Sequence, residues 1–235
     1  MKIIIHNGIM MLVVNMSKSI KMSFILNLII FVLVFIATLF MVLNIKFMNV
    51  EDFVFLSSKI EVLKYYTVDF NIFMGVMSLI YCIYVILGKK MSKLLYILKL
   101  ASTIGVVLTF LTVVFYLAPA SKKGYFILFT NSNLFYHFIV PVLSFVTYVF
   151  FENNKLKIKD CLLSIIPTLI YALFYLFNVL VHLNNGIVLY EYDWYGFATG
   201  GIVGIIIVFL LMLFITFIIG VLLNMFNKIC MKKYK

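Results

Sequence analysis

The sequence contains no arginine and no glutamine, and only 11% of its 235 residues are charged. Soluble domains usually carry about 25% charged residues, so this chain lacks the polar side chains needed to enclose a water-exposed fold. A soluble enzyme, a secreted scaffold and a disordered regulator are thereby excluded. The absence of arginine also excludes bidentate phosphate clamps and an arginine-based voltage sensor.

Cysteine is scarce as well, and its spacing matches no metal or redox motif. The three cysteines are Cys82, Cys161 and Cys230, an odd number with no CxxC or Cys/His ligand spacing. We expect them to be small apolar residues of a helical bundle. His137 and His182 lie in different predicted spans, and no third ligand shares their faces, so they fall short of a metal site. Because haem and nucleotide motifs are also absent, we expect no cofactor and no metal.

Apolar residues, in contrast, make up 66% of the chain, against about 45–50% in an ordinary soluble domain. A transmembrane helix needs about 20 apolar residues, and six stretches qualify. They lie near residues 22–45, 65–87, 100–117, 128–151, 161–182 and 196–223. We therefore predict an all-α fold, a polytopic membrane bundle of six transmembrane helices over residues 22–225.

Two short segments flank this predicted membrane domain. Residues 1–21 form a short cytoplasmic or interfacial segment, and residues 226–235 form a basic cytoplasmic tail. Met1, Met16 and Met22 are three alternative starting residues, because the last two lie next to the first span.

The positions of the lysines predict the orientation of the bundle. All 19 basic residues are lysines, and with the N-terminus inside, fourteen fall in inner segments, including Lys99 just before the third span. The five outer ones are Lys46, Lys59, Lys64, Lys122 and Lys123. Cytoplasmic loops carry the excess of lysine, so we predict that both termini are inside. The charges lie between apolar runs, so the net charge of +11 does not indicate a nucleic-acid partner.

Polar residues inside the spans are the candidates for function, because such side chains are costly in a bilayer. Three pairs are spaced by four residues, which places each pair on one helix face. The pairs are Thr67 with Asn71, Asn133 with His137, and Asn178 with His182. All six residues fall in the outer halves of their spans, whereas the inner halves hold only the weakly polar Ser78, Cys82 and Ser144. Either an outward-opening polar pocket or interhelical hydrogen bonds worth about 0.6 kcal/mol each explain this pattern.

Asp69 lies two residues after Thr67, about 200° around a helix of 3.6 residues per turn. It does not share the face of Thr67, so a Thr-His-Asp triad that includes Asp69 is not supported. A carboxylate within a span can instead bind a proton or a cation, and a transporter would have to use Asp69 in this way.

Small residues and a proline mark two further places. Gly196, Gly200 and Gly204 form a small-xxx-small pattern in the sixth span, which favours close helix packing within the chain or in a homo-oligomer. Pro141 lies one turn after His137 and frees a backbone carbonyl at a similar depth. A kink there would open space beside His137.

Three stretches resemble a widespread family of uncharacterised bacterial six-span membrane proteins. They are KYYTVDFN at 64–71, NSNLFYH at 131–137 followed by Pro141, and EYDWYGF at 191–197. The layout is more distantly similar to the androgen-induced membrane hydrolases, relatives of the androgen-dependent TFPI-regulating protein. Members of that group are six-span threonine hydrolases that cleave esters of hydroxy fatty acids. The resemblance implies a multi-pass protein of a bacterial plasma membrane.

The resemblance also implies roles for individual residues. Thr67 matches the nucleophile of the hydrolases, and His137 matches their catalytic histidine. An imidazole can remove the proton of a threonine hydroxyl, and Asn71 or Asn133 could donate to the oxyanion that forms on an ester carbonyl. Asn178 and His182 complete the list of predicted pocket residues. The expected partner is then a membrane lipid, with a lipid ester as substrate.

The residues leave three kinds of function open. One is hydrolysis of a fatty-acyl ester through Thr67 and His137. Another is a non-catalytic role, in which the protein binds a lipid or a small solute or acts as a partner subunit. The third is transport through Asp69.

Overall fold

The computed structural model describes residues 17–48, 59–152, 154–184, 187–189 and 191–232. Within these ranges the chain is helical and contains no strand beyond an isolated bridge between Asn184 and Ile187. The predicted all-α fold is thus confirmed. Met1, Met16 and most of the predicted segment 1–21 lie outside the described residues, and Met22 lies inside the first described helix.

Six helical runs in the described part of the chain are long and apolar enough to cross a membrane. They are α2 (Lys18–Val42), α3 (Tyr66–Ile86), the run Lys93–Ala120, the run Ser132–Phe150, the run Ile158–Val181 and α10 (Gly201–Lys232). The second run comes after a short 3-10 helix, η1 (Lys59–Lys64). The number of spans agrees with the sequence prediction, and the bounds differ at several ends.

Three of these runs consist of more than one helical segment. The run Lys93–Ala120 joins α4 (Lys93–Thr112), the π-helical turn η2 (Val113–Leu117) and α5 (Ala118–Ala120). The run Ser132–Phe150 joins α6 (Ser132–Leu134), the π-helical turn η4 (Phe135–Ile139) and α7 (Val140–Phe150). The run Ile158–Val181 joins α8 (Ile158–Leu163) and α9 (Ile166–Val181). Two 3-10 helices, η3 (Tyr125–Phe129) and η5 (Phe197–Gly200), precede the fourth and sixth runs.

Local sequence explains several of these boundaries. Ser92 caps α4 by accepting a hydrogen bond from the backbone N–H of Leu95 at 3.3 Å, and capping serines start helices. The third span therefore begins at Lys93 rather than near residue 100. Pro141 is the second residue of α7, and the π-helical turn η4 just before α7 accommodates this proline, which has no N–H to donate. At the other end of the chain, α10 continues to Lys232, so most of the predicted tail 226–235 is helical.

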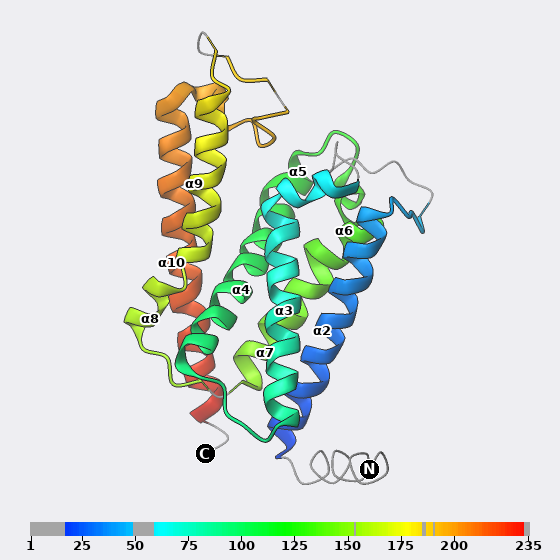
Figure 1. The fold of residues 1–235 in the computed structure, drawn as a ribbon, viewed down its shortest axis with the longest axis vertical. Coiled ribbons are helices and arrows are strands. Elements are labelled where there is room, and N and C mark those ends of the chain that lie inside the picture. The colour runs from blue at the N-terminus through cyan, green and yellow to red at the C-terminus, as the bar shows by residue number, and fades with distance from the viewer. Residues whose placement is uncertain (1–16, 49–58, 153, 185–186, 190, 233–235) are drawn as a thin grey trace.

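Helices α2, α3, α4 and α7 lie side by side, and α10 crosses α4 and α7 with its C-terminal half (Figure 1). Helix α9 runs beside the N-terminal half of α10. The start of α2 and the end of α10 lie at the same end of the bundle (Figure 1). We call this end the inner end, after the predicted orientation, and the opposite end the outer end.

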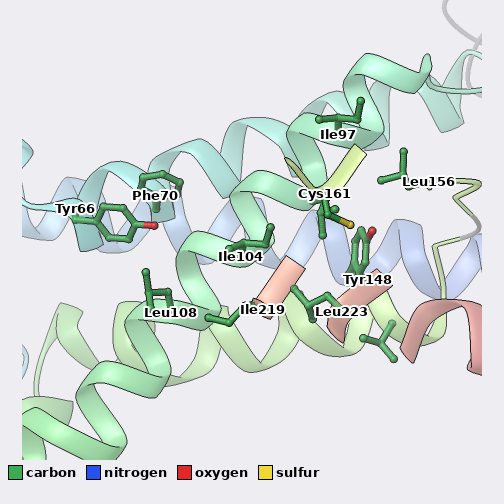
Figure 2. Close-up of a cluster of buried hydrophobic side chains, with 12 residues drawn as sticks. Tyr66, Phe70, Ile97, Ile104, Leu108, Tyr148, Leu156, Cys161, Ile219 and Leu223 are labelled. Carbon is green, nitrogen blue, oxygen red and sulfur yellow. The ribbon is translucent and has the colours of Figure 1, made fainter. Parts of the chain in front are cut away.

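The largest apolar core joins α3, α4, α7 and α10 (Figure 2). Tyr66 and Phe70 stack with ring centroids 4.1 Å apart at one end of this core. Ile104 of α4 lies in its middle, and Tyr148 of α7 and Leu223 of α10 lie toward the other end.

The three cysteines are free, and their surroundings agree with the prediction. Cys82 and Cys161 are buried and Cys230 is partly buried. Cys161 belongs to the apolar core described above. They pack as small apolar residues of the bundle.

Glycine allows close approach between helices, but at positions that the small-xxx-small pattern did not indicate. A Cβ atom on Gly105 of α4 would lie 1.8 Å from Cδ1 of Phe70 on α3. A Cβ on Gly75 of α3 would lie 2.8 Å from Cγ1 of Val34 on α2. These two glycines let α2, α3 and α4 pack closely.

The prediction that Gly196, Gly200 and Gly204 lie along one helix is wrong. Gly196 has a φ of 70° and Gly201 a φ of 65°, so the backbone is left-handed at both positions and α10 begins only at Gly201. Gly196 and Gly200 therefore precede the helix, and a Cβ at either would meet nothing within 4 Å. A homo-oligomer through Gly196, Gly200 and Gly204 stays a prediction.

Replacing Gly105 by alanine is expected to destabilise the bundle, because Phe70 must move away from the new methyl group. Overpacking of this kind costs about 1–3 kcal/mol, so the melting temperature in detergent should fall. Gly204→Ala is the matched control, since its new Cβ meets only the carbonyl of Phe197 at 3.7 Å and alanine favours helix. Equal melting temperatures of the two variants would contradict the close α3–α4 contact.

Candidate functional site

At the outer end, Asn71 connects the start of α3 to the π-helical turn η4. Its buried amide Nδ2 donates to the carbonyl of Thr67 at 2.7 Å and to the carbonyl of Tyr136 at 3.3 Å. The Oδ1 atom of Asn71 is buried and has no hydrogen-bond partner among the described residues. The turn that carries Thr67 is thus held next to the residue that precedes His137.

His137 is almost fully buried, with 1% of its surface exposed. Its ring Nδ1 lies 2.6 Å from the carbonyl oxygen of Leu128. A carbonyl can only accept a hydrogen bond, so Nδ1 carries the proton and, in the neutral ring, Nε2 carries the lone pair. The imidazole is therefore fixed in one tautomer by the chain segment before η4.

The described hydrogen bonds do not include one between the Thr67 hydroxyl and His137. Thr67 is partly buried in the first turn of α3. Asn133 is buried, and its Oδ1 has no hydrogen-bond partner among the described residues. The structure thus places Asn71 beside the η4 segment, and the direct pairing of Thr67 with His137 stays a prediction.

Asn178 and His182 hold an outer loop against α9. Asn178 donates from Nδ2 to the carbonyl of Tyr192 at 2.6 Å. The His182 ring stacks on the Tyr192 ring, with centroids 3.6 Å apart and 5° between the planes. None of the described contacts of this pair reaches Thr67 or His137. The pair acts as a support for the loop, and its place in a pocket stays a prediction.

The same loop is fixed by an acidic residue at the start of η5. The carboxylate of Asp193 is buried and accepts hydrogen bonds from the backbone N–H groups of Phe197 at 3.0 Å and Ala198 at 2.9 Å. The hydroxyl of Tyr175 on α9 also donates to it. Asp193 thereby joins the loop to α9 and to η5, the short helix that precedes α10.

Tyr195 of this loop and Tyr171 of α9 contact the end of η1 and the start of α3. The hydroxyl oxygen of Tyr195 accepts a hydrogen bond from the N–H of Tyr66 at 2.8 Å, and the hydroxyl of Tyr171 donates to the carbonyl of Lys64 at 2.6 Å. Burial, with the neighbouring Tyr171, raises the pKa of Tyr195 well above the ordinary value of a phenol. The Tyr195 hydroxyl is therefore neutral, as an acceptor at this position must be in apolar surroundings.

The inner half of the bundle holds a buried ion pair that the sequence analysis missed. Lys99 on α4 and Glu152 after α7 are both fully buried, and Lys99 Nζ lies 3.7 Å from Glu152 Oε1. The ammonium donates to Oδ1 of Asn27 on α2 at 2.5 Å and to Oγ of Ser78 on α3 at 2.9 Å. Side chains of α2, α3 and α4 thus meet the residue that follows α7.

Asn27 links the two charges of this pair. While its Oδ1 accepts from Lys99, its Nδ2 donates to Oε1 of Glu152 at 3.0 Å and to the carbonyl of Ser23 at 2.9 Å. The second carboxylate oxygen, Oε2, is buried without a hydrogen-bond partner among the described residues. On the far side, Asn227 of α10 donates to the carbonyl of Glu152 at 2.7 Å. Glu152 and its partners therefore connect five parts of the bundle, namely α2, α3, α4, the end of α7 and α10.

This arrangement corrects two statements made from the sequence. Lys99 does not belong to an inner loop, because α4 begins at Lys93 and continues past it. The inner halves of the spans also hold more than Ser78, Cys82 and Ser144, since Asn27, Lys99 and Glu152 are buried there. The sequence signals that could have indicated this cluster are an amide at residue 27 in a long apolar run and a lysine seven residues after the helix-capping Ser92.

These observations define the class of the protein. It is a multi-pass integral membrane protein, an all-α bundle of six apolar helical runs in its described part. The chain matches no protein-family model, no curated protein and no solved structure. Its described residues contain no group of three or more His, Cys, Asp or Glu side chains arranged to hold a metal ion.

Replacing Lys99 by methionine is expected to destabilise the fold strongly. The change leaves the Glu152 carboxylate buried without its cation, and breaking a buried pair in this way costs about 3–5 kcal/mol. The measurement is the free energy of unfolding in detergent. Lys90→Met is the control, because Lys90 is exposed in the loop before α4. If both variants unfold alike, the ion pair does not stabilise the bundle.

Proposed function

We propose that this protein hydrolyses a fatty-acyl ester of a membrane lipid at the outer half of the bundle, with Thr67 as nucleophile and His137 as base. The observation that carries the proposal is the hydrogen bond between Nδ1 of His137 and the carbonyl of Leu128. It places the proton of the neutral ring on Nδ1, so Nε2 is the basic nitrogen of the ring, as a general base requires. The more distant similarity to the threonine hydrolases, in which Thr67 matches the nucleophile and His137 the catalytic histidine, supports the same roles.

The proposed reaction has two steps. In the first, His137 Nε2 takes the proton of the Thr67 hydroxyl while the Thr67 oxygen attacks the ester carbonyl. The tetrahedral intermediate then collapses, the alcohol leaves with the proton from His137, and the acyl group stays on Thr67. In the second, His137 takes a proton from the water that attacks the acyl-threonine carbonyl. The tetrahedral intermediate then collapses, the Thr67 oxygen leaves with the proton from His137, and the fatty acid is released.

This reaction requires the Thr67 hydroxyl to come within hydrogen-bond distance of His137 when substrate is bound. Catalytic hydrogen bonds are often long in unliganded enzymes and shorten in the complex. The contact between Asn71 and the carbonyl of Tyr136 supports such an approach, because it holds the two segments together. Both amide hydrogens of Asn71 are engaged, so we assign the oxyanion contact to the amide of Asn133.

The experiment labels the detergent-purified protein with a fluorophosphonate probe, which reacts with activated hydroxyl nucleophiles. The parent chain should be labelled, whereas Thr67→Ala and His137→Gln should lose the label because one lacks the nucleophile and the other the base. Thr67→Ser should retain it. Glu61→Gln is the control, since Glu61 is exposed on η1.

A folded parent chain that stays unlabelled would contradict the proposal, as would full labelling of Thr67→Ala. The protein would then be better described as a non-catalytic membrane protein that binds a lipid or a small solute. Melting temperatures of all variants, measured alongside, separate loss of the nucleophile from loss of the fold.

A further inference from the structure

A crevice between α3 and α9 contains a carboxylate that the proposed hydrolysis does not use. Its volume is about 340 Å³. Helix α3 contributes Asp69, Phe70 and Phe73 to its lining, and α9 contributes Pro167, Ile170, Tyr171 and Phe174. All of these residues belong to two helical runs that are long and apolar enough to span a membrane.

The carboxylate of Asp69 is partly buried and takes part in no hydrogen bond or ion pair among the described residues. An ionised side chain in a membrane-spanning segment is costly without a partner of opposite charge. Glu152, the buried acidic side chain at the opposite end of the bundle, does have a cationic partner. Asp69 is therefore a carboxylate that can take an ionic partner from outside the described chain.

The walls of the crevice define what that partner can be. Three phenylalanines and Tyr171 line it, and aromatic faces attract cations through their π electrons. The hydroxyl of Tyr171 already donates to the carbonyl of Lys64 and accepts from Nε1 of Trp194. Tyr171 thus offers its ring to the crevice, and Asp69 is the polar group that remains for a ligand.

This chemistry excludes other ligand classes. A metal ion such as calcium or magnesium takes six or more oxygen ligands, and one carboxylate supplies at most two. An anion would be repelled by Asp69, and a sugar or a nucleotide would find too few hydrogen-bond partners. The remaining class combines one positive charge with hydrocarbon, which aromatic rings and a single carboxylate recognise together.

We propose that the crevice between α3 and α9 is a binding site for an alkylammonium group, in which Asp69 pairs with the cationic nitrogen, and the aromatic rings and apolar walls contact the hydrocarbon. The ammonium group can belong to a free cationic amphiphile or to a lipid headgroup. The site is independent of Thr67 and His137, since Asp69 points to a different side of α3 than Asn71 does. Transport of an amphiphilic cation through Asp69 would begin here.

The single tryptophan of the chain provides a direct readout. Nε1 of Trp194 lies 3.3 Å from the Tyr171 hydroxyl, so a ligand beside Tyr171 should change the fluorescence of Trp194. Protein in an uncharged detergent is titrated with dodecyltrimethylammonium, and separately with dodecanol as the uncharged analogue. We expect saturable binding of the cation and no saturable response to the alcohol.

Two variants test the residues. Asp69→Asn removes the charge while keeping the shape, and it should weaken binding of dodecyltrimethylammonium by about tenfold or more. Phe174→Ala removes one ring, and because 62% of Phe174 is exposed this change should leave the fold intact and also weaken binding. Glu61→Gln should bind like the parent, since Glu61 lies outside the crevice.

Unchanged affinity in Asp69→Asn, or equal responses to the cation and the alcohol, would overturn the proposal. Competition identifies the source of the ammonium group. Displacement of the probe by phosphatidylethanolamine in mixed micelles indicates a lipid headgroup, and displacement by dodecylamine alone indicates a free amphiphile. None of these readings depends on the reaction at Thr67, and labelling of Thr67 by fluorophosphonate does not depend on Asp69.

Discussion

Lys99 and Glu152 place opposite charges inside the bundle, where either charge alone would be unfavourable. Asn27 satisfies both charges by accepting from one and donating to the other. Because the partners come from α2, α3 and α4 and from the residue after α7, the pair holds these segments in one fixed arrangement. The outer-end geometry follows from it, since the same helices carry Thr67, Asp69 and His137.

The two ends of the bundle use polar groups differently. At the inner end, amides and charges bond mainly to one another across helices, which is a structural use. At the outer end, Asn178 and Asp193 support a loop, whereas Asn71, Asn133 and Asp69 keep oxygen atoms without hydrogen-bond partners among the described residues. Oε2 of Glu152 at the inner end also lacks a hydrogen-bond partner among the described residues, so the reasons for placing substrate and ligand binding at the outer end are the orientation of His137 and the crevice beside Asp69.

Much of the fold could be predicted from the sequence, because a bilayer requires long apolar helices and their length is visible in one chain. The ion pair could not be predicted, because the pairing of Lys99 with Glu152 depends on how the helices are rotated about their axes and on the depth of each residue in the bundle. The prediction that Gly196, Gly200 and Gly204 lie along one helix was wrong because Gly196 and Gly201 adopt left-handed backbone conformations, which a spacing of four residues does not reveal. The place of His137 was predicted, but the π-helical turn that carries it was not.

A double-mutant cycle on Lys99 and Glu152 tests the central claim most directly. The free energies of unfolding of Lys99→Met, Glu152→Met and the double variant are compared with that of the parent in the same detergent. The account predicts that the double variant loses less stability than the sum of the two single losses, by about 1 kcal/mol or more, as for residues in direct contact. Additive losses would show that the two charges do not interact and would contradict the account.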